Sequence, residues 1–216
     1  MINDSSHPTS AQLLGRACVA GATVAVILAA TTQAVQTDTD IPTHQLSYPW
    51  WSEAAVLFYL LAAGSQLLLA AGVLGLRRSG VAGTGRAADL GLLAAITGTA
   101  LIAVGDLATI PLRHELVDSG WPRVVETIFA VGTVVSTLGF LVAGRATVRA
   151  GVWTDWRRFT PLAIGIWSVA LVGLQFTSLL PTAVGIYALC FLALGVALAG
   201  SGHRAPVAPR AGAQRA

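Results

Sequence analysis

Long apolar runs separated by short polar segments dominate this sequence. Pro181 interrupts the last of them, and because proline disfavours helix at the residue before it, we expect a tight reversal at about 178–181. The hydrocarbon core of a bilayer is roughly 30 Å thick, so a helix needs about 20 apolar residues to cross it. The runs therefore predict an all-α integral membrane protein with six transmembrane helices, at about 13–35, 52–76, 87–110, 124–143, 161–178 and 182–199.

The remaining segments are polar. Residues 1–12 form a polar lead, and residues 201–216 are mostly Arg, Pro and Ala. Neither segment has enough apolar side chains to build a core, so both are expected to be disordered. The folded domain is expected to be 13–200.

Composition excludes a soluble globular protein. Hydrophobic residues make up 55% of the chain and charged residues 11%, whereas soluble domains carry about 25% charged residues. The formal net charge of +3 comes from 13 basic residues, all arginine and mostly in short loops. That placement indicates contact with a lipid bilayer and not with nucleic acid.

The arginines also predict an orientation. Cytoplasmic loops of membrane proteins carry an excess of basic residues. With both termini in the cytoplasm, only Arg113 and Arg123 lie outside. The inner segments then hold Arg16, Arg77, Arg78, Arg86, Arg145, Arg149, Arg157, Arg158, Arg204, Arg210 and Arg215. We therefore expect a multi-pass protein of the cell membrane with N-in/C-in topology.

The first apolar run has a second interpretation, as a signal peptide. Arg16 would be its basic region, 17–30 its apolar region and Thr32-Gln33-Ala34 a weak cleavage site. The run is long for such a segment, so a retained helix is favoured. The orientation of the other helices is the same in both interpretations.

A weak internal repeat follows the predicted helices. Pro42, Pro111 and Pro181 recur about 70 residues apart, each just beyond an odd-numbered span, which suggests three repeated helical hairpins. The alternative is that hairpins of similar length align without any common origin.

Small residues recur at every fourth position in two of the predicted helices. Such stripes allow the backbone of another helix to approach closely, either within the chain or in a partner membrane protein or second copy. In an Ala-rich sequence they also arise by chance. The stripes are Ala17, Gly21, Ala25 and Ala29 in the first span, and Ala87, Gly91, Ala95, Thr99 and Ala103 in the third.

Asp106 is the most informative residue, because it is a carboxylate near the outer end of an apolar span. An ionised Asp at the centre of a membrane helix costs on the order of 2.5–3.5 kcal/mol, and less near the end. Water or a partner such as Arg113 or Arg123 would relieve that cost. Asp106 is therefore either a functional cation or proton site, or general acid, or a structurally paired side chain.

Other polar residues are expected near the same outer face. Glu53 and Glu126 lie in the first turns of the second and fourth spans, where they also complement the helix dipole. Ser52, either Asp118 or Ser119, and Thr160 fit helix N-caps. If the outer helix ends converge, Glu53, Asp106 and Glu126 could share a vestibule with Gln36, His114 and Gln175.

Tryptophans flank several runs and are expected to lie at the membrane interface. Trp51 and Trp121 could also contact a ligand, and Trp153 and Trp156 are expected to anchor the other side. Trp167 and Tyr187 fall within spans and are expected to pack internally.

Motifs for metal, phosphate or redox chemistry are missing from the sequence. Cys18 and Cys190 lie in separate apolar runs, and the Gly-rich segment 80–85 lacks a lysine. No cofactor and no metal site is predicted.

Three functions remain open. A binding or transport protein would receive a cation, a proton or a small amphiphile at the outer carboxylates. An intramembrane enzyme would use Asp106 as an acid, with Glu53 or Glu126 as its partner, on a lipid or isoprenoid-like substrate. A non-catalytic accessory protein would bind a partner through its small-residue helix faces.

Overall fold

The computed structural model describes residues 8–175 and 177–200, and it is helical throughout its ordered elements. Across these ranges the β structure is limited to one isolated bridge between Gln45 and Leu116. This confirms the all-α prediction. The elements are α1 (Ser10–Val35), α2 (Ser52–Arg78), α3 (Arg86–Leu112), α4 (Gly120–Ala150), the short 3-10 helix η1 (Trp156–Phe159), α5 (Thr160–Leu174) and α6 (Leu180–Ala199).

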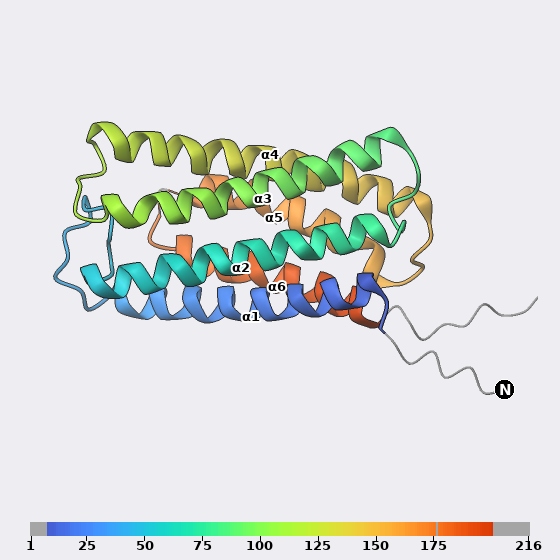
Figure 1. Cartoon of the computed structure of the whole chain (residues 1–216), viewed down its shortest axis with the longest axis horizontal. Helices are drawn as coiled ribbons and strands as arrows, with labels where there is room; N and C mark the ends of the chain where they lie inside the picture. The colour runs from blue at the N-terminus through green and yellow to red at the C-terminus, as the bar shows by residue number, and fades with distance from the viewer. Residues whose placement is uncertain (1–7, 176, 201–216) are drawn as a thin grey trace, which may run out of the picture.

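The six α-helices form a closed ring. Each helix packs antiparallel against the next, and α6 returns to pack along α1 (Figure 1). The segments 36–51 and 113–119 meet residues 175 and 177–179 at one end of the bundle, here called the acidic end. The opposite, arginine end holds the segments 79–85 and 151–159 together with the start of α1 and the last residue of α6.

Five of these helices are long and apolar enough to cross a membrane: α1, α2, α3, α4 and α6. This indicates a multi-pass membrane protein. Helix α5 has 15 residues and stops at Leu174, short of the predicted end of the fifth span at 178.

The short α5 leaves part of α4 uncovered. Gly144 of α4 lies against the backbone of Leu162, and Gly165 of α5 lies against Leu141. In this antiparallel register α5 runs beside the second half of α4. The first turns of α4, at the acidic end, therefore have no α5 residue alongside them.

The small-residue stripes are used for packing within the chain. A Cβ on Gly91 of α3 would lie 2.9 Å from the nitrogen of Ala143 and 3.0 Å from the carbonyl oxygen of Gly139, both on α4. In α1, a Cβ on Gly21 would lie 2.9 Å from the carbonyl oxygen of Ser65 on α2. Helices in lipid associate through such close backbone contact, because burial of apolar area gives no net driving force there.

The helix caps differ from two of the sequence predictions. Trp51, not Ser52, is the N-cap of α2, and Phe159, not Thr160, is the N-cap of α5. The hydroxyls are used elsewhere: Ser52 Oγ accepts from Arg113 Nε at 2.9 Å, and Thr160 Oγ1 donates to the carbonyl of Arg157 at 2.8 Å. Ser119, one of the two residues expected there, is the N-cap of α4.

Several helices extend beyond their apolar runs. Arg145 and Arg149, expected in a loop, lie in the last turns of α4. Helix α1 begins at Ser10, inside the lead expected to be disordered, because Thr9 and Gln12 form a capping box. The predicted C-terminal tail, 201–216, lies outside the described residues.

Trp153 corrects another prediction. It is 7% exposed and belongs to the core, whereas Trp156 is 51% exposed, as an interfacial side chain would be. Gly151 has a left-handed φ of 64° and ends α4 there. The chain then turns back, so that Trp153 packs inside the bundle and cannot anchor at its surface.

Candidate functional site

A cavity of about 710 Å³ lies inside the ring and extends from the acidic end to about the middle of the bundle. This volume is within the range of about 300–1,000 Å³ typical of small-molecule sites. All six helices contribute to its wall. The lining residues are Ala25, Leu28, Ala29, Thr32, Phe58, Ala62, Ser65, Gln66, Ile102, Asp106, Glu126, Phe129, Ala130, Thr133, Ser136, Ser168, Leu171, Gln175, Leu180, Pro181, Val184 and Tyr187.

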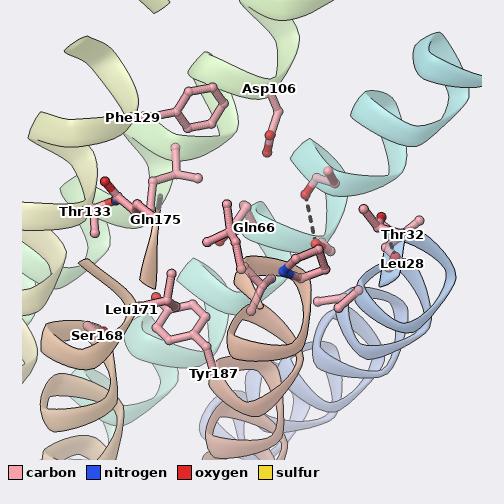
Figure 2. A pocket seen from close by; sticks show the side chains of 18 of the residues that line it. Leu28, Thr32, Gln66, Asp106, Phe129, Thr133, Ser168, Leu171, Gln175 and Tyr187 are labelled. Carbon is pink, nitrogen blue, oxygen red and sulfur yellow. Dashed lines mark hydrogen bonds between the residues drawn. The ribbon is translucent and has the colours of Figure 1, made fainter. Parts of the chain in front are cut away.

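Asp106 projects from α3 into this cavity (Figure 2). The residue is only 7% exposed, and its Oδ2 atom has no hydrogen-bond partner within the described part of the chain. The nearby hydroxyl of Thr109 donates to the carbonyl of Gly105 at 2.9 Å. A buried polar atom without a partner is uncommon in native proteins, because it forfeits its hydration.

Neither of the arginine partners considered for Asp106, Arg113 and Arg123, forms an ion pair with it among the described residues. Arg113 donates from Nε to Ser52 Oγ and from Nη1 to the carbonyl of Ile110, each at 2.9 Å. Among residues 8–175 and 177–200, the ion pair that the structure contains joins Arg77 to Asp89 at the arginine end. Asp106 is therefore not held by a structural salt bridge.

A second unpartnered acceptor lines the same cavity. Gln66, near the middle of α2, has a buried Oε1 atom with no hydrogen-bond partner among the residues described. Ser136 of α4, which also lines the cavity, has its hydroxyl 3.4 Å from that of Thr99 on α3. Figure 2 shows Gln66, Thr133, Ser168 and Gln175 arranged with Asp106 around the space.

Glu126 lies toward the acidic end of the same cavity. It is exposed and sits in the part of α4 that extends beyond the end of α5. Gln175, directly after α5, contributes to the lining as well. Because α5 is short, the cavity is open near these two residues.

The turn from α5 to α6 is tied to α1 by two side-chain hydrogen bonds. Gln36 Nε2 donates to the carbonyl of Ser178, and Thr182 Oγ1 donates to Gln33 Oε1, both at 2.8 Å. These bonds position Leu180 and Pro181, which form part of the cavity wall.

The remaining wall is apolar, with aromatic side chains near Asp106. The Phe129 ring lies against Gly105, the residue before Asp106. On α2, Phe58 stacks on Trp50 with ring centroids 5.0 Å apart. The site thus combines one deeply buried carboxylate, a few amides and hydroxyls, and a mostly hydrophobic surface.

The structure brings together three of the residues proposed from the sequence: Asp106, Glu126 and Gln175. Five others lie outside the lining of this cavity. Glu53 and Trp51 are exposed, Gln36 bonds to Ser178, and His114 Nε2 lies 3.0 Å from Ser52 Oγ. Trp121 is 73% exposed and lines a separate apolar groove of about 390 Å³ that also includes Pro111.

Sequence reasoning missed several cavity residues, chiefly Gln66, Thr133 and Ser136, and interpreted Tyr187 as a packing residue alone. A glutamine in the middle of an apolar span was a usable signal. The hydroxyl residues gave none, because Ser and Thr commonly satisfy themselves on the backbone of their own helix, as Thr137 does with Thr133 at 2.7 Å.

No protein-family model matches this chain, and comparison with curated proteins and with solved structures found no match either. The class of protein is therefore defined by its helices and its cavity. It is an all-helical protein whose five long apolar helices indicate that it spans a membrane more than once.

Proposed function

We propose that this is a six-span protein of the cell membrane, with both termini in the cytoplasm, that binds or transports a small lipophilic molecule in a cavity facing outward. The distribution of charge supports the orientation. Of the described arginines, only Arg113 and Arg123 are near the acidic end, and the others are near the arginine end. The positive-inside rule assigns the arginine end to the cytoplasm.

One observation carries the proposal of a ligand. A carboxylate that is 7% exposed and lacks a partner on Oδ2 points into a cavity of about 710 Å³. Ionisable groups at membrane depth are expensive, and they mark binding or transport sites by default. The apolar wall would hold the body of a ligand, and the polar groups would orient it.

The two other hypotheses have less support. An acid–base enzyme would use a second carboxyl group beside Asp106. Glu53 lies outside the cavity lining, and Glu126, which does line the cavity, is exposed and so lacks the dry surroundings that such an acid needs. An accessory protein would need its small-residue stripes on the surface, and these largely face other helices of the chain.

Extraction of the purified protein followed by mass spectrometry tests the proposal. We expect a small molecule to co-purify with the natural protein and to be depleted in Ala130→Trp, which adds bulk to the lining where α4 is exposed. Val134→Trp is the matched control, since Val134 lies on the same helix, is 50% exposed and is not part of the lining. Equal recovery from all three proteins would contradict the proposal.

A further inference from the structure

We propose that the ligand of this cavity is an organic cation: a protonated amine carried on a compact apolar body. This inference rests on the proposed ligand-binding function and specifies its chemistry. It follows from which hydrogen-bonding groups of the cavity lack partners, and from the sign of the charges around them.

The unpartnered groups are acceptors. Asp106 Oδ2 and Gln66 Oε1 both line the cavity, both are buried, and neither has a donor among the residues that the structure describes. An ionised carboxylate accepts hydrogen bonds only, and a protonated amine supplies up to three donors with no acceptor. A ligand ammonium group therefore complements either atom, because it supplies the donor that each of them lacks.

The charge of the wall has one sign. Its acidic side chains are those of Asp106 and Glu126, and none of the described residues that line it is Arg, Lys or His. Arg113, the basic residue nearest in sequence to Asp106, donates instead to Ser52 and Ile110. Glu126 lies where the cavity is open, so it would attract a cation before the cation reaches Asp106.

Aromatic rings add to this preference. The Phe129 ring is held against Gly105, beside Asp106, and Figure 2 shows ring and carboxylate on the same side of the cavity. A cation near an aromatic face is attracted by the ring quadrupole. An anionic ligand would meet repulsion from both the carboxylate and the ring face.

Three probes with the same apolar body test the inference. They are 1-adamantylammonium, 1-adamantanol and 1-adamantanecarboxylate, which share the adamantane cage and carry a positive, a neutral and a negative polar group. Binding is measured by calorimetry at pH 7 on the full-length protein in phosphatidylcholine nanodiscs, with empty nanodiscs as the blank. We expect the ammonium to bind at least about tenfold more tightly than the alcohol, and the carboxylate not to bind.

Substitution assigns the effect to Asp106. Asp106→Asn should lower the affinity for 1-adamantylammonium by at least about tenfold and leave the affinity for 1-adamantanol unchanged. Asp118→Asn is the matched control, because it makes the same chemical change at an exposed loop residue outside the lining, and it should alter neither affinity. Gln66→Leu should lower the affinity for 1-adamantylammonium more than the affinity for 1-adamantanol. This variant tests the inference even if Asp106→Asn does not fold.

The outcomes separate this inference from the proposed function. If the alcohol or the carboxylate binds as tightly as the ammonium, and neither variant changes the ammonium affinity, the cavity binds ligands but has no preference for a cation. If none of the three compounds binds above the blank, both the cation and the ligand-binding proposal are wrong for a body of this size.

Discussion

The ring of Phe129 on α4 lies directly over Gly105 on α3. A Cβ atom at position 105 would be 3.0 Å from both Cε1 and Cζ of the ring. Gly105 precedes Asp106, so this contact fixes an aromatic ring next to the only deeply buried carboxylate of the described chain. Helices α3 and α4 together therefore determine the surroundings of the Asp106 side chain.

Gly105→Ala should move this ring by a few tenths of an ångström. We expect the affinity for 1-adamantylammonium to fall by about threefold, since a cation–π contact contributes about 0.5–1 kcal/mol at accessible sites. Thermal stability should hold or rise, because the ring can shift and alanine favours helix over glycine by about 1 kcal/mol. Unchanged affinity measured by calorimetry would show that the ring does not contact the ligand.

Asp106→Asn should stabilise the ligand-free protein. The substitution keeps the shape of the side chain and replaces a group that can ionise at a buried site without a partner by one that cannot. An unsatisfied buried polar group costs about 1–3 kcal/mol, and more when it is charged. The measurement is thermal unfolding in detergent without ligand, with Asp118→Asn as the control. A lower unfolding midpoint for Asp106→Asn would mean that Asp106 has a structural partner.

Gly91→Ala should destabilise the α3–α4 contact. The new methyl group would lie 2.9 Å from the nitrogen of Ala143 and 3.0 Å from the oxygen of Gly139, so the two backbones must separate. Overpacking of this kind costs about 1–3 kcal/mol. Gly64→Ala is the matched control, because it lies within α2 with nothing within 4 Å of its Cβ position, and its unfolding midpoint should not fall. Equal midpoints for the two variants would contradict this packing.

Cysteine labelling tests the orientation. In a Cys18→Ala, Cys190→Ala background, Asp118→Cys at the acidic end should react with a membrane-impermeant maleimide in intact cells. Thr84→Cys at the arginine end should react only after lysis. Both positions are exposed, so access to the reagent and not burial decides the result. The reverse pattern would show that the cavity faces the cytoplasm.

The positions of the helices were predictable because the bilayer imposes a strong and local constraint. A backbone in hydrocarbon must satisfy its own hydrogen bonds, so each long apolar run becomes a helix wherever its neighbours lie. The predicted run 87–110 corresponds to α3, and the split at Pro181 corresponds to separate helices α5 and α6. Asp106 was identifiable for the same reason, since a carboxylate in such a run is costly.

The rest of the site depends on contacts between segments far apart in the sequence. The short α5 was missed because the apolar run continues past Leu174, while the chain turns there. Gln36, Glu53 and His114 were expected with Asp106, but helix rotation and loop contacts place them outside the cavity lining. Trp153 was wrongly assigned to the membrane interface. Its position in the interior results from the turn at Gly151, which the pattern of apolar residues does not show.

By itself, then, the sequence determined the class of protein, the approximate helices and the one costly carboxylate, because these follow from the transfer of short segments between water and lipid. The tertiary structure alone decided that α6 closes the ring on α1, that α5 leaves the cavity open, and that Gln66 and Phe129 surround the space with Asp106. Those features depend on the rotation and register of packed helices. The small-residue stripes indicate where two backbones can approach closely, but they do not say which helices meet.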